Sequence, residues 1–156
     1  MREFLHPDAI PAAEAYIRSL AAEGGFTVPE RLLKKMMQWD RAFVAAGGVL
    51  GSGSDPWGSG LLPGFGNLRN YELLIEAGFS AEAAVKIMTL NGATIPGESD
   101  RIGSVEVGKA ADLFVVRGDP VARAAAIYDV THVFRDGVGY DPAKLLGAAR
   151  GKVAAP

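Results

Sequence analysis

One carboxylate in this chain stands where an active-site acid is often found. Asp55 follows a short apolar stretch, residues 48–51, and a Gly-Ser-rich step, and Pro56 comes directly after it. The stretch is too short for a helix and lacks polar alternation, which is typical of a strand buried on both faces of a parallel α/β sheet. Sites in such sheets and barrels gather at the carboxyl ends of the strands. Because Pro56 favours an extended backbone at Asp55, the sequence predicts a carboxylate held in one direction at such a site.

The segment after Asp55 is predicted to be a loop over the same site. Residues 56–67 are rich in glycine and contain two prolines, and loops at strand ends commonly carry binding residues. Trp57 in this loop, with Arg69 and Asn70 at the start of the next helix, are therefore candidates for substrate binding. The alternatives are that Trp57 packs within its own loop and that Arg69 and Asn70 are solvated residues of a helix start.

Other chemistries fit this stretch less well. An aspartate in this place can also cap a loop or the next helix. A phosphate-binding loop is disfavoured, because Gly51 and Gly53 are not followed by a third glycine at position 56 and no Gly-Lys-Ser/Thr follows. A serine hydrolase is disfavoured as well, since no serine lies in a Gly-x-Ser-x-Gly elbow.

Composition narrows the class of protein. The 156 residues are 49% hydrophobic and 22% charged, with a net charge of -2, which is typical of a globular domain. The even mixture of charges disfavours a nucleic-acid partner, and no apolar run predicts a membrane span. No cationic segment leads into an apolar run after Met1, so a cytoplasmic location is favoured. With no cysteine, a metal ion could be bound only by histidine or oxygen ligands.

Helical and strand patterns alternate along the chain. Helices are predicted from Asp8 to Ala22, from a Thr27 cap to Ala46, over residues 71–77, and from a Ser80 cap to about Leu90, where Asn-Gly should end the helix. Strands are predicted at 113–116, 130–134 and 138–140, the last two joined by an Asp136-Gly137 turn and followed by a helix capped by Asp141.

The change in pattern near residue 97 predicts two regions, 1–97 and 98–156, neither of which is complete. A strand buried on both faces needs neighbours along both edges, and the first region offers one confident strand. Its partners must come from further sequence or from another chain.

Four stretches, taken in order, resemble the carboxyl-terminal part of metal-dependent amidohydrolases of the imidazolonepropionase-like and prolidase-like groups. They are residues 46–55, 72–80, 93–97 and 101–116. The last contains Ile-Gly-Ser-Val-Glu-Val-Gly-Lys-Ala-Ala-Asp-Leu, which is similar to the family's most recognisable tail signature.

The resemblance implies an α/β fold: the C-terminal part of a (β/α)₈ TIM barrel (1–97), followed by strands of a small composite β-sandwich (98–156). It implies that Asp55 ends the last barrel strand, binds a divalent metal, expected to be Zn²⁺, and moves a proton between a metal-activated water and the leaving group. The implied activity is hydrolysis of an amide or other non-peptide C–N bond, or of a dipeptide, in a small-molecule substrate.

This chain departs from the family pattern in its histidines. The family's His-x-His pair and further histidines are absent, and His6 and His132, beside a helix start and in a hairpin, are poor substitutes. Catalytic zinc usually takes three protein ligands, so the chain alone is not expected to be a competent enzyme.

The expected partner is the missing N-terminal barrel portion or a complementary chain that completes a split enzyme. A non-catalytic interaction module that pairs its strand edges is the alternative, and a homo-oligomer stays open.

Overall fold

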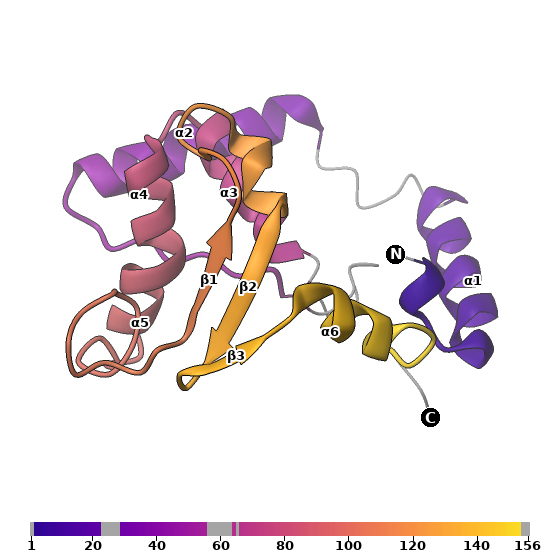
Figure 1. Ribbon diagram of the computed structural model, residues 1–156. Coiled ribbons are helices and arrows are strands. Elements are labelled where there is room, and N and C mark those ends of the chain that lie inside the picture. The colour runs from indigo at the N-terminus through magenta and orange to yellow at the C-terminus, as the bar shows by residue number, and fades with distance from the viewer. Residues whose placement is uncertain (1, 23–28, 56–63, 65, 154–156) are drawn as a thin grey trace.

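The computed structural model describes residues 2–22, 29–55, 64 and 66–153, in which most helices precede a small antiparallel sheet and α6 follows it (Figure 1). The helices are η1 (Arg2–Phe4), η2 (Pro7–Ala9), α1 (Ile10–Ala22), α2 (Glu30–Ala45), α3 (Gly66–Glu76), α4 (Ala81–Lys86), the π-helical η3 (Ile87–Asn91), α5 (Gly92–Thr94), η4 (Ala124–Tyr128) and α6 (Pro142–Ala149). The strands are β1 (Leu113–Val116), β2 (Val130–Arg135) and β3 (Val138–Tyr140). None of the described helices is long and apolar enough to cross a membrane.

Several element ends follow from the local signals that predicted them. Ser80 Oγ accepts a hydrogen bond from the Ala83 N–H at 3.2 Å at the start of α4. Asp141 Oδ1 accepts one from the Ala143 N–H at 2.8 Å at the start of α6. Gly47 has a φ of 89°, a left-handed conformation that only glycine adopts at little cost, and it ends α2. These predictions are confirmed.

Three helix ends were predicted wrongly. The helix predicted from residue 71 begins earlier, at Gly66, within the stretch predicted to be a loop. Asp8 does not start α1: it lies within η2, a separate 3₁₀ turn capped by His6, whose Nδ1 accepts the Asp8 N–H at 3.3 Å, and α1 begins at Ile10. The Ser80 helix does not end at Asn91-Gly92. Gly92 keeps a helical φ of −58°, so the helix continues through η3 into α5, and the positive φ comes later, at Gly97 (81°). Thr27, predicted to cap α2, lies outside the described residues.

The sheet is antiparallel, with β2 between β1 and β3. Asp136 and Gly137 have φ values of 52° and 78°, which confirms the predicted tight hairpin turn with two positive φ angles. Asp112 holds this turn from outside the hairpin: its carboxylate accepts the Asp136 N–H at 2.7 Å and pairs with Arg135.

One hydrophobic core joins the helices to the sheet region. Tyr71 of α3, which is 1% exposed, donates its hydroxyl to the Pro120 carbonyl oxygen at 3.1 Å. The buried cluster contains Tyr71, Leu74, Ala81, Ala84, Ile87 and Ile127, and the partly buried residues packed on it include Leu50 and Val116. The core thus takes side chains from both of the predicted regions, and the boundary near residue 97 stays a prediction.

The two ends of the described chain meet. Leu5 and Val153 form a parallel β-bridge, with the His6 N–H donating to the Val153 carbonyl at 2.9 Å. Arg150 and Glu3 add an ion pair at 3.4 Å. As a result, α1 and α6 lie at the same end of the molecule (Figure 1).

The strand predicted at residues 48–51 is not formed. No residue of this segment belongs to a strand, and Val49 is 49% exposed instead of buried. The prediction failed because an isolated extended segment becomes a strand only when neighbouring strands accept its backbone hydrogen bonds. Mixed helices and a small antiparallel sheet agree with the expected α/β class, while the barrel and the sandwich stay predictions.

Candidate functional site

Asp55 lies at the end of a described segment, with its side chain exposed. Its φ is 34°, so the extended backbone predicted from Pro56 is wrong. Aspartate is one of the few residues with a side chain that visit the left-handed region, because its short carboxylate can form local hydrogen bonds. A non-glycine residue held there costs about 1–3 kcal/mol, and such residues are found disproportionately at functional sites.

The segment that leads to Asp55 is fixed by contacts with α2 and with η3. Gly48 lies beneath the Phe43 ring, where a β-carbon would come within 2.4 Å of the ring's Cζ. The Leu50 carbonyl oxygen accepts a hydrogen bond from Asn91 Nδ2 at 2.9 Å. These contacts take the place of the strand pairing that was predicted.

Sequence reasoning missed Asn91. The residue was assigned only a helix-ending role, because Asn-Gly pairs commonly close helices. It is in fact the last residue of η3, and its side-chain amide reaches a segment 41 residues earlier in the chain. No signal in the sequence pointed to this contact, because its two partners lie 41 residues apart.

The three candidate substrate-binding residues have different surroundings. Arg69, on α3, pairs through Nη1 with Glu72 Oε2 at 2.8 Å and, more loosely, through Nη2 with Glu76 at 3.8 Å. Asn70, the next residue, is half-buried. Trp57 lies outside the described residues. The role of these three residues in substrate binding stays a prediction.

Glu72 is the centre of a small polar network on α3. Its Oε2 accepts hydrogen bonds from Arg69 and, at 3.0 Å, from the Tyr128 hydroxyl, which comes from η4. The Arg69 hydrogen bond, followed by the Tyr128 hydrogen bond, lowers the pKa of Glu72. Desolvation and the bond to Glu72 raise the pKa of Tyr128. The network keeps Glu72 ionised and Tyr128 protonated, and it joins α3 to η4.

Replacing Glu72 with Gln should destabilise the fold at neutral pH, and this effect should shrink in acid. Because the folded-state pKa of Glu72 is lowered, its contribution is present above the unfolded value of about 4.3 and is lost as the pH falls through the folded value. Urea unfolding of the wild-type chain and Glu72→Gln at several pH values measures this. Tyr128→Phe removes one of the hydrogen bonds that lower the pKa of Glu72, so the stability that Glu72 contributes should be lost at a higher pH. An equal stability difference at neutral and acid pH contradicts the prediction.

Within the described residues, no group of three or more His, Asp or Glu side chains is placed to hold a metal ion. His132 is exposed on β2, with its ring stacked on Phe134 at a centroid distance of 6.4 Å. His6 caps η2, and its Nδ1 lies 3.6 Å from Asp8. Both histidines are therefore in the places that their sequence context predicted.

A groove of about 340 Å³ lies between the start of α3 and the face formed by β1 and β2. Its walls are mainly apolar side chains, with Asn67 and Asp112 as polar members. The Asp112 carboxylate is already bound by Arg135 and by the Asp136 N–H. The groove therefore offers little polar chemistry of its own.

Comparison with known proteins gives one family and a set of related folds. The model described as "Amidohydrolase family" matches residues 16–141. No curated protein matches the chain. The matched range includes Asp55, Asn91 and the whole of β1 to β3.

Solved structures resemble the chain over part of their length. A putative prolidase from Bifidobacterium longum is 32% identical, with a TM-score of 0.59 over 73% of this chain and 29% of its own. An amidohydrolase from Thermotoga maritima MSB8 is 30% identical, with a TM-score of 0.57 over 67% of this chain and 26% of its own. Molinate hydrolase, 23% identical with a TM-score of 0.57 over 83% of this chain and 30% of its own, shows the fold alone. This chain therefore spans between 26% and 30% of these proteins.

Proposed function

We propose, from the premise that the chain belongs to the amidohydrolase family, that it forms the carboxyl-terminal part of a metal-dependent hydrolase of amide or related C–N bonds. The observation that carries the proposal is the family match over residues 16–141, which contains Asp55 at the end of a segment held by α2 and η3. The left-handed φ of this exposed acid, 34°, supports a functional position.

We propose that the architecture is completed by further polypeptide. Residues 48–55 would then form the last strand of a (β/α)₈ barrel, and β1 to β3 would belong to a small composite β-sandwich. Two observations support this. Val49 is half exposed at 49%, as expected of a strand whose neighbours are elsewhere. Among the described strands, β1 and β3 each have only one paired edge, and exposed edges are normally covered.

Asp55 is proposed to accept and then return the proton that the reaction moves. A divalent ion, expected to be zinc, would lower the pKa of a bound water so that it ionises near neutral pH. Asp55 would accept the proton that this water loses as its oxygen bonds to the substrate carbon. The same carboxyl group would return the proton to the nitrogen when the C–N bond breaks. Small amides and dipeptides are the proposed substrates, since prolidase-named structures are among the similar folds.

The described residues supply only part of the ligands that a metal ion needs. Asp55 offers one carboxylate, and no cluster of three ligands is formed in the described ranges. A catalytic zinc usually takes three protein ligands. The remaining ligands are therefore proposed to come from the polypeptide that completes the barrel, and the cytoplasmic location expected from the sequence stays a prediction.

A second candidate function is a non-catalytic interaction module. The observation that favours it is the pair of open edges on β1 and β3 within the described sheet. Phe114 and Val115 of β1 are 47% and 44% exposed, and their side chains, on opposite faces of the sheet, add apolar surface that a partner could cover. A purified chain that stays a compact monomer at high concentration would exclude this function.

The coding DNA upstream of Met1 tests the main proposal. We expect an open frame, joined to this one or carried by a neighbouring gene, that encodes a His-x-His pair and further histidines. An in-frame stop with no such sequence nearby would count strongly against a truncated or split hydrolase.

A further inference from the structure

A π-helical segment lies next to the chain that leads to Asp55. Residues Ile87–Asn91 form η3 between α4 and α5. Such segments interrupt α-helices rarely, and they often occur at functional sites because they change the direction of the side chains that follow. Here the last π-helical residue, Asn91, donates from Nδ2 to the Leu50 carbonyl oxygen at 2.9 Å in a partly buried contact.

The residue after Leu50, Gly51, is held by the turn that follows α5. A β-carbon on Gly51 would lie 2.7 Å from Ile95 Cδ1, so the Gly51 backbone lies directly against the residue that follows α5. The Leu50 side chain packs on the hydrophobic core. Leu50 and Gly51, five and four residues before Asp55, are thus held by a side-chain amide, a close backbone approach and the core.

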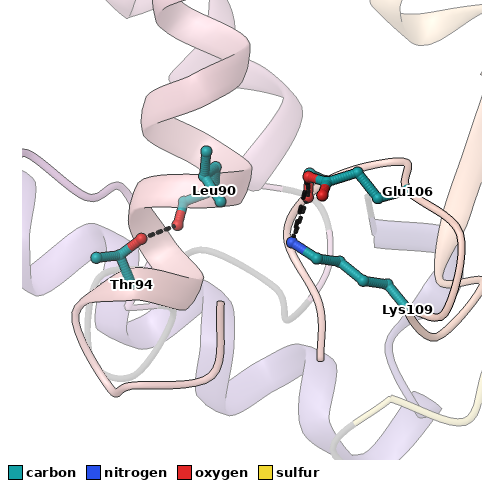
Figure 2. Close-up of polar contacts among 5 residues, drawn as sticks. Leu90, Thr94, Glu106 and Lys109 are labelled. Carbon is teal, nitrogen blue, oxygen red and sulfur yellow. Dashed lines mark hydrogen bonds and ion pairs between the residues drawn. The ribbon is translucent and has the colours of Figure 1, made fainter. Parts of the chain in front are cut away.

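The helical segment is itself held by the loop that precedes β1. Gly103 has a φ of 96°, and a β-carbon there would lie 2.7 Å from Ala93 Cβ and 3.1 Å from Leu90 Cα. The loop is closed by Lys109, whose side chain is 13% exposed and whose Nζ lies 2.6 Å from Ser104 Oγ and 3.4 Å from Glu106 Oε1. Figure 2 shows the Lys109–Glu106 pair beside the turn that carries Leu90 and Thr94.

We propose that Asn91 is a positioning residue for Asp55. The inference rests on the proposed function, because it assumes that the Asp55 carboxylate acts in the reaction. Asn91 anchors the Leu50 carbonyl oxygen from η3, and the loop at Gly103 packs against Leu90 of η3. A segment with three glycines between positions 48 and 53 has high backbone freedom, and the amide anchor restricts where its last residue can lie.

The test measures the mobility of residues 51–55 in the 156-residue chain. Asn91→Asp keeps the shape of the side chain but, when ionised, cannot donate to a carbonyl oxygen, and Asn91→Ala removes the donor without adding charge. In both variants, the backbone ¹⁵N order parameters of residues 51–55 should fall from about 0.85 to below about 0.6. Thr94→Val is the matched control, since it removes a hydrogen bond from Thr94 Oγ1 to the Leu90 carbonyl at 2.8 Å in the same helical segment. It should leave residues 51–55 unchanged.

Kinetics in the assembled enzyme, meaning this chain together with the polypeptide that supplies the other ligands, give the second readout. Asn91→Asp should lower kcat by roughly 10- to 100-fold with little change in KM, because a small displacement of a reacting group is costly. Unchanged order parameters at residues 51–55 in both Asn91 variants, or an equal fall in Thr94→Val, overturn the inference. Full activity of Asp55→Asn would instead remove the proposed function, while the order parameters would still decide whether Asn91 anchors the segment.

Discussion

Replacing Asp55 with Asn should lower kcat of the assembled enzyme by about 10²–10⁴-fold. The amide of asparagine is close in size to the carboxyl group, but it cannot accept and return the proton that the proposed hydrolysis would move from water to the leaving nitrogen. The Asp55 side chain is exposed, so the substitution should change the free energy of unfolding little. Steady-state kinetics and a urea unfolding curve on the same preparation measure both quantities.

Asp100→Asn is the matched control for this experiment. Asp100 is also an exposed aspartate, in the turn that follows α5, and it lies outside the proposed site. Its replacement should leave kcat and KM within error of the wild-type values. If Asp55→Asn retains wild-type turnover, Asp55 has no proton-transfer role.

The second large effect is expected at Gly103, in the tail signature. Gly103→Ala should lower the free energy of unfolding by about 2–5 kcal/mol. Of this, about 1–2 kcal/mol comes from a side chain in the left-handed region, where Gly103 has a φ of 96°. About 1–3 kcal/mol comes from forcing a methyl group into occupied space, since the new β-carbon would lie 2.7 Å from Ala93 Cβ. Chemical denaturation measures the sum.

Gly108→Ala separates the two contributions. Gly108 has a φ of 94°, and nothing lies within 4 Å of a β-carbon placed there. Its substitution should therefore cost only the backbone part, about 1–2 kcal/mol. Equal destabilisation by Gly103→Ala and Gly108→Ala would show that the contact between this loop and η3 does not constrain residue 103.

The parts of the fold that the sequence predicted correctly depend on neighbours close along the chain. Ser80 and Asp141 cap their helices by bonding N–H groups two or three residues away. Asp136 and Gly137 form the hairpin turn through their own backbone angles. Such interactions need no knowledge of the remaining fold, and so residue types and spacing are enough to predict them.

Two local signals failed, the helix cap at Asp8 and the extended backbone at Asp55. The larger failures concern distant partners. The segment at residues 48–51 has the composition of a buried strand, but a strand depends on neighbours that the described chain does not provide. The Asn-Gly pair at 91–92 is a typical signal of a helix end, but the helix continues past it. There Asn91 binds Leu50, 41 residues away, and Gly103 packs against the helix. Tertiary contacts of this kind override local preference.

For the candidate site, the role of Asp55 stays a prediction, and the sequence did not predict its surroundings. Asp55 lies after the segment that was predicted to present it, with a φ of 34° in place of an extended backbone. Arg69 was expected to be either a substrate contact or a solvated residue, and it is paired with Glu72, which Tyr128 binds from 56 residues away. The pairing of Arg69 with Glu72, three residues on, could be expected from helical spacing, whereas the contribution of Tyr128 could not.

Zinc titration tests the central claim most directly, which is that Asp55 belongs to a metal site completed by other polypeptide. We expect the 156-residue chain alone to bind zinc weakly and without a defined stoichiometry, and the assembled enzyme to bind it tightly and to lose affinity on Asp55→Asn. Calorimetry of the wild-type and Asp55→Asn forms, alone and assembled, makes the comparison. Tight, stoichiometric binding of zinc by the 156-residue chain alone would contradict the claim.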